Sequence, residues 1–108
     1  MNGNLAKQIR KLCDQIASEF HPERIILFGS HAYGRARPDS DVDLLVIMPF
    51  EGRPTRQAIE ILNRLNALTP IDLLVRTPEQ VQERLALGDR FMREIVERGK
   101  VMYEAHHA

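Results

Sequence analysis

Two aspartates stand two residues apart at the start of an apolar segment, and a Gly-Ser pair precedes them. Asp41 and Asp43 lead into residues 44–47, Leu-Leu-Val-Ile, which are typical of a buried β-strand. Because side chains alternate along a strand, the spacing predicts that both carboxylates point to the same face. Two like charges on a half-buried face repel each other and resist burial, and a cation between them relieves both costs. The spacing therefore favours a cation site over the alternative, a solvated start to the strand.

A third carboxylate, Asp72, lies near the start of a second apolar segment, residues 71–75. If the two strands are neighbours, Asp41, Asp43 and Asp72 converge at one end of the sheet. Carboxylate oxygens that leave the other positions to water and phosphate suit Mg²⁺. Two such ions roughly 3.5–4 Å apart clamp the attacking and leaving oxygens of a phosphoryl displacement. Alone, Asp72 is consistent with a strand-edge carboxylate, and only its company supports the metal site.

Gly29 and Ser30 offer a place for phosphate beside these carboxylates. They follow a short apolar strand at residues 24–28 and precede a single helical turn expected at residues 31–34. A strand that ends in glycine and enters a helical turn exposes backbone N–H groups at a positive dipole end. Ser30 adds a hydroxyl donor, and Gly29 lets phosphate approach the backbone closely. The segment is not a Walker A loop, because no Gly-Lys-Ser/Thr follows.

Hydrophobic periodicity predicts the elements that position these residues. Helices are expected at about residues 4–20, 55–68 and 78–98, the last with a break near Gly88, and strands at 24–28, 41–48, 71–75 and 101–103. Thr77, Pro78 and Gln80 form a helix start with a capping box. Strands separated by helices favour an α/β fold, a small mixed sheet flanked by helices, in which the second and third strands are parallel.

Composition limits the classes of protein that this chain can belong to. Its 108 residues suit one domain spanning 1–108, and 15 basic residues balance 15 acidic ones, which argues against a free-standing nucleic-acid binder. The single cysteine, Cys13, lies in the apolar register of the first helix and is expected in the core. No apolar run approaches the length of a membrane span or an export signal, so a cytoplasmic protein is expected.

The motif resembles the signature of the DNA polymerase β-type nucleotidyltransferase superfamily. The pattern Gly-Ser-x-Ala-x-Gly followed by Ser-Asp-x-Asp-Leu is matched by Gly29, Ser30, Ala32, Gly34, Ser40, Asp41, Asp43 and Leu44, and Asp72 matches the third carboxylate. The short chain, ending in Gly-Lys-Val-Met-Tyr-Glu at residues 99–104, resembles the minimal nucleotidyltransferase (MNT) group. The resemblance extends over nearly the whole chain, and a single-domain nucleotidyltransferase fold is what it implies.

The resemblance implies transfer of a nucleoside monophosphate, here AMP from ATP, to a hydroxyl group with release of pyrophosphate. Asp41 and Asp43 would bind two Mg²⁺ ions, and Asp72 would complete the metal site that activates the acceptor hydroxyl. Gly29 and Ser30 would hold the β- and γ-phosphates, with Ser40 beside them in the nucleotide-binding set. The nucleobase preference is left open, because no residue is seen to bind a base edge.

The identity of the acceptor depends on a partner. No segment forms an acceptor domain, so a second subunit, another copy or a different protein, is expected to complete the site. The chain resembles the MNT antitoxins of HEPN–MNT toxin–antitoxin modules, which implies adenylylation of a tyrosine of a HEPN-type ribonuclease partner. The alternatives are modification of a small molecule such as an aminoglycoside, and a non-catalytic antitoxin that acts by occlusion.

Several polar side chains near the motif keep two interpretations. His31 and Tyr33 are expected to pack, with nucleotide or partner contact as the alternative. Arg35 and Arg37 either contact triphosphate or an acidic partner, or are solvated. Arg76 is expected in a surface salt bridge, with a role in the site as the alternative.

Overall fold

The computed structural model describes residues 3–37 and 39–106, which form four helices and four strands. In chain order these are α1 (Gly3–Phe20), β1 (Arg24–Phe28), β2 (Val42–Ile47), α2 (Pro54–Arg64), β3 (Ile71–Arg76), α3 (Pro78–Ala86), α4 (Arg90–Arg98) and β4 (Lys100–Glu104). Each predicted strand is present, and the predicted break near Gly88 separates α3 from α4. The predicted α/β class is confirmed.

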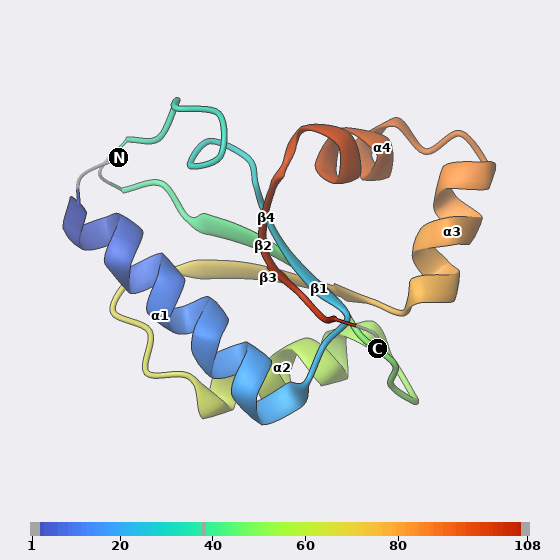
Figure 1. The fold of residues 1–108 in the computed structure, drawn as a ribbon, viewed down its shortest axis with the longest axis horizontal. Helices are drawn as coiled ribbons and strands as arrows, with labels where there is room; N and C mark the ends of the chain where they lie inside the picture. The colour runs from blue at the N-terminus through green and yellow to red at the C-terminus, as the bar shows by residue number, and fades with distance from the viewer. Residues whose placement is uncertain (1–2, 38, 107–108) are drawn as a thin grey trace.

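The four strands form one mixed sheet in the order β3-β2-β1-β4. β1 is antiparallel to both β2 and β4, whereas β2 and β3 are parallel and are connected through α2. The predicted parallel pairing is therefore confirmed. Figure 1 shows α1 and α2 on one side of the sheet and α3 and α4 on the other, so helices cover both faces.

Alternation along β2 supplies a hydrophobic cluster on each side of the sheet. Val42, Leu44 and Val46 belong to the cluster with α1 and α2. Leu45 and Ile47 belong to the cluster with α3 and α4. Because β2 is apolar on both faces, it reads as a continuous run in the sequence. Asp43 shares the α3/α4 face with Leu45 and Ile47, and is the one carboxylate within this strand.

Two helix ends differ in how well the sequence predicts them. α3 begins with the predicted capping box, in which Thr77 and Gln80 exchange side chain–backbone hydrogen bonds of 3.0 and 3.1 Å. α2, in contrast, ends at Arg64, because Leu65 adopts an extended backbone. The predicted helix to residue 68 is too long, and Leu68, expected in its apolar stripe, is 85% exposed. Among the described residues, no helix has the length and apolar character that crossing a membrane requires.

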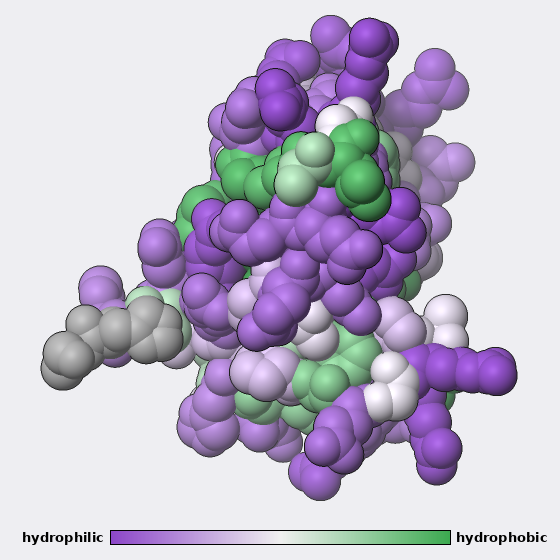
Figure 2. Space-filling model, turned by 90° about the vertical axis from the view of Figure 1, so that its right-hand side faces the viewer, coloured by the Kyte–Doolittle hydropathy of each residue, from purple (hydrophilic) through white to green (hydrophobic). Residues whose placement is uncertain are grey.

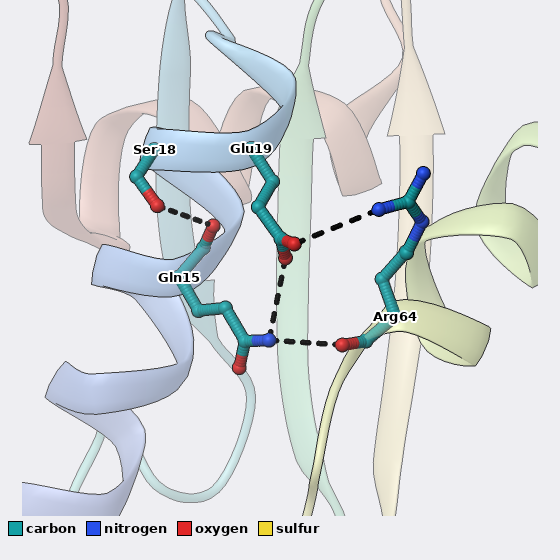
Figure 3. A network of polar contacts seen from close by, with 4 residues as sticks. All are labelled: Gln15, Ser18, Glu19 and Arg64. Carbon is teal, nitrogen blue, oxygen red and sulfur yellow. Dashed lines mark hydrogen bonds and ion pairs between the residues drawn. The ribbon is translucent and has the colours of Figure 1, made fainter.

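A small polar network joins the two helices on the α1/α2 side. The Gln15 amide donates to the carbonyl oxygen of Arg64 at 2.8 Å and to Glu19 at 3.3 Å. The Arg64 guanidinium lies 3.8 Å from the Glu19 carboxylate, and Figure 3 shows Gln15 and Glu19 pointing across to the end of α2. The network satisfies the last carbonyl of α2.

Cys13 of α1 is buried, which confirms the prediction that it belongs to the core. Burial raises the pKa of its thiol to about 12.

Candidate active site

Three residues from three neighbouring strands lie in one row at the end of the sheet. Asp43 of β2 pairs with Phe28, the last residue of β1, and with Asp72 of β3. Because β2 and β3 are parallel and in register, the two carboxylates stand side by side on the α3/α4 face. The ladder with β3 starts at Val42, one residue after Asp41, so Asp41 has no partner residue on β3.

The carboxylates of this row affect one another. Asp43 is half-buried, whereas Asp41 and Asp72 are exposed. Burial raises the pKa of Asp43, and the charges of Asp72 and Asp41 and a hydrogen bond to the Asp72 side chain raise it further, with His31 opposing them. The fold therefore holds an anion that is unfavourable by itself, and a cation at this point would relieve both burial and repulsion.

Position 29 requires glycine, both for its backbone conformation and for the space beside Asp43. Its φ of +73° lies in the left-handed region, and a Cβ atom there would collide with Oδ2 of Asp43. Its carbonyl accepts from the N–H groups of Ala32 and Tyr33 at 3.0 and 3.2 Å, which forms the predicted turn. Ser30 and His31 at the start of this turn donate their backbone N–H groups to no described residue. Two donors beside Asp43 are thus available to an anion.

His31 ties this turn to the loop that leads into β2. The side chain is 3% exposed, and its Nε2 lies 3.0 Å from the carbonyl oxygen of Ser40. The Ser40 hydroxyl accepts from the backbone N–H of Arg37 at 2.8 Å. His31 is therefore the packed residue that the sequence favoured. Ser40 shapes the loop before Asp41, and its predicted contact with a nucleotide stays a prediction.

A cavity of about 290 Å³ opens over the carboxylate row. It is lined by Phe28, Gly29, Tyr33, Asp43, Asp72, Phe91, Glu94 and Ile95. The structure thus brings Gly29, Asp43 and Asp72 together and leaves Asp41 outside the lining. No group of three His, Cys, Asp or Glu side chains within residues 3–37 and 39–106 is placed to hold one metal ion. The assignment of Asp41, Asp43 and Asp72 as metal ligands stays a prediction, which the Asp43–Asp72 pair fits.

Comparison with known proteins identifies the family. The model of the nucleotidyltransferase domain matches residues 6–104. This chain belongs to the nucleotidyltransferase domain family. Family membership supports nucleotidyl transfer as the general reaction.

A solved structure shows the same fold. A Sulfolobus solfataricus protein assigned as a nucleotidyltransferase superimposes with a TM-score of 0.63 and 19% sequence identity, covering 91% of this chain and 78% of that one. At this identity the likeness concerns the fold, and it supports a nucleotidyltransferase fold for the present chain. No curated protein matches the sequence.

In this nucleotidyltransferase domain, helix α4 forms one wall of the cavity, which the sequence did not predict. Phe91, Glu94 and Arg98 recur at helical spacing and so lie on one stripe of this helix. The Phe91 ring meets Phe28 edge to face, with ring centroids 5.8 Å apart. The Arg98 guanidinium lies 5.3 Å from the centre of the Tyr33 ring and 3.7 Å from Glu94. The stripe mixes apolar, acidic and basic side chains, so periodicity of apolar residues could not reveal it.

Gly99 permits α4 to pack this closely on the sheet. A Cβ atom at Gly99 would lie 2.5 Å from both Ile26 Cγ2 and the carbonyl oxygen of Ile95. Its φ is −69°, so Gly99 does not form a left-handed helix cap. The glycine is needed for close packing of the end of α4 against β1, and this packing sets α4 over the cavity.

The three arginines near the motif lie outside the cavity lining. Arg76 ends β3, at the far end of the strand from Asp72, and donates to the carbonyl oxygen of Val75 at 2.7 Å. Burial and the nearby Arg84 lower its pKa, and among the described residues Arg76 forms no ion pair, so the expected surface salt bridge is wrong. Arg35 and Arg37 are exposed in the loop before β2.

Proposed function

We propose that this nucleotidyltransferase domain transfers AMP from ATP, with Mg²⁺, to a tyrosine hydroxyl of a HEPN-type toxin, and so acts as an antitoxin. The observation that carries the proposal is the close approach of Gly29 to Asp43, with Asp72 in register beside them. One position thus offers phosphate donors and a carboxylate pair that is unfavourable without a cation.

Each side chain has a definite task in this proposal. Asp43 and Asp72 would hold Mg²⁺, together with the exposed Asp41 that precedes β2. When bound, Mg²⁺ would supply charge neutralisation for the triphosphate and a lowered pKa for the acceptor hydroxyl. The N–H groups of Ser30 and His31 bind phosphate oxygens at the turn that Gly29 begins. Asp72, the more exposed of the paired carboxylates, accepts the proton of the incoming hydroxyl.

A protein acceptor agrees with the form of the cavity. At about 290 Å³ it is small, and no further domain of the described chain encloses it. A tyrosine has a pKa of about 10, so at neutral pH it requires a base or a metal ion to become a nucleophile. The partner then supplies the acceptor, and the resemblance to MNT antitoxins favours a HEPN-type protein.

The experiment incubates the purified protein with Mg²⁺, α-³²P-labelled ATP and the product of the adjacent gene, and then measures the intact mass of that product. We expect a gain of one or more AMP units that disappears with Asp43→Asn. Asp39→Asn is the matched control, because Asp39 is an exposed carboxylate of the loop before β2 and does not line the cavity.

Other outcomes support the alternatives. A tight complex without label, retained by Asp43→Asn, would contradict adenylylation and support occlusion. Label on neither protein, but on an added aminoglycoside, would support a small-molecule acceptor. In each case the transfer of AMP to the partner would be rejected as the function.

A further inference from the structure

The side of the molecule formed by α3 and α4 carries exposed apolar side chains, and one of them is at the cavity. Figure 2 shows apolar side chains gathered in a band across this side, between hydrophilic surfaces. Leu87 and Phe91 are 73% and 55% exposed. An exposed apolar side chain is ordinary by itself. Phe91 differs from Leu87 because it lines the same cavity as Gly29, Asp43 and Asp72.

The α4 stripe has an apolar end and a cationic end. Phe91 and Arg98 are seven residues apart, which is on the order of 10 Å along the helix axis. Arg98 lies over Tyr33 of the turn that follows Gly29, where backbone donors are free. Glu94 between them, with Asp43 and Asp72 opposite, disfavours bare phosphate oxygens beside Phe91. A bound triphosphate therefore belongs at the turn, and an uncharged group belongs at Phe91.

The ring of Phe91 is held in place while much of it stays open to solvent. Its edge-to-face contact with Phe28, at an interplanar angle of 85°, limits its rotation without covering it. Phe28, the last residue of β1, is itself 8% exposed. A fixed and partly exposed aromatic ring gains free energy when a planar aromatic group stacks on it.

We propose that Phe91 is the platform on which the base of a bound nucleoside triphosphate stacks. The inference rests on the proposed function for its ligand, and it adds a base-binding residue that the motif does not contain. Stacking uses the face of the base and not its hydrogen-bonding edge. The site therefore discriminates weakly among bases, and purines, which have the larger face, bind better than pyrimidines.

The test compares two ligands, ATP and inorganic tripolyphosphate, each titrated with Mg²⁺ into the wild-type protein by calorimetry. The same titrations are made with Phe91→Leu, which keeps apolar volume without a ring, and with Phe91→Tyr, which keeps the ring. We expect Phe91→Leu to weaken ATP binding by about tenfold and to leave tripolyphosphate binding unchanged. Phe91→Tyr should retain the affinity for ATP. Leu87→Ala is the control for loss of an exposed apolar side chain outside the cavity.

Three results would overturn the platform. An equal loss for ATP and tripolyphosphate in Phe91→Leu would show that Phe91 acts by supporting Phe28 and the turn. Unchanged ATP binding with a raised KM for the protein acceptor would show that the ring receives the acceptor tyrosine instead. A wild-type protein that binds neither ligand would reject the proposed function as well, which separates that failure from the first two.

Discussion

Replacing Gly29 with alanine places a methyl group where the turn after β1 meets Asp43. The φ of +73° costs an alanine about 1–2 kcal/mol, and the loss of unfolded-state freedom returns about 0.4–1 kcal/mol of this. The new Cβ also collides with Oδ2 of Asp43, which must move to a poorer conformation at a cost of about 0.5–1.5 kcal/mol. We expect a destabilisation of about 2 kcal/mol in all, or a fall in Tm of about 10 °C.

Gly34→Ala separates the two contributions to this loss. Gly34 has nearly the same φ, +72°, and no atom lies within 4 Å of the position of its Cβ. It should therefore lose only the backbone part, about 1 kcal/mol. In a double-mutant cycle, Asp43→Ala should return Gly29→Ala to the cost of Gly34→Ala, because the colliding oxygen is gone.

Thermal and urea unfolding followed by circular dichroism measure these differences, and titration with Mg²⁺-ATP measures the effect on the site. Gly29→Ala should lose ATP binding because Asp43 is displaced, whereas Gly34→Ala should keep it. Equal destabilisation by the two substitutions, or wild-type ATP binding by Gly29→Ala, would refute the close approach of Gly29 and Asp43 as the organising contact of the site.

Two further predictions concern the carboxylates. Because the fold raises the pKa of Asp43, the protonated form of this carboxyl stabilises the folded protein. That contribution is complete below a pH of about 3.9 and is lost as the pH rises through the raised pKa. In EDTA at pH 7, Asp43→Asn should thus unfold at a temperature no lower than that of the wild type. Added Mg²⁺ should raise the Tm of the wild type but not that of Asp43→Asn. A Tm of Asp43→Asn in EDTA markedly below that of the wild type would contradict this expectation. Asp41→Asn should abolish transfer with little loss of stability, because Asp41 is exposed and repels Asp43; unfolding or full activity of this variant would show that the charge has another role.

Local signals in the sequence were sufficient for most of the fold. The apolar runs gave the strands, and a helix between the second and third runs required a crossover that makes β2 and β3 parallel. The capping box at Thr77 is a contact between residues three apart, so the sequence contains all of it. These features depend on neighbours along the chain, and for that reason they could be predicted.

The features that the sequence did not reveal depend on how distant parts of the chain assemble. Leu68 satisfies the apolar spacing of α2, but the helix ends at Arg64, before this spacing can bring it to the core. The ladder between β2 and β3 starts one residue too late to include Asp41, and alternation alone does not give that register. The approach of α4 to the cavity depends on Gly99 packing against Ile26, a contact between two elements that only the assembled sheet contains.

The central claim is that Gly29, Asp43 and Asp72 form a Mg²⁺-ATP site. Calorimetric titration of ATP into the wild-type protein, with Mg²⁺ and then with EDTA, tests it most directly when repeated with Asp43→Asn and Asp39→Asn. We expect saturable binding that requires Mg²⁺, is lost in Asp43→Asn and is retained in Asp39→Asn. ATP binding that persists in Asp43→Asn, or that is the same in EDTA, would contradict it.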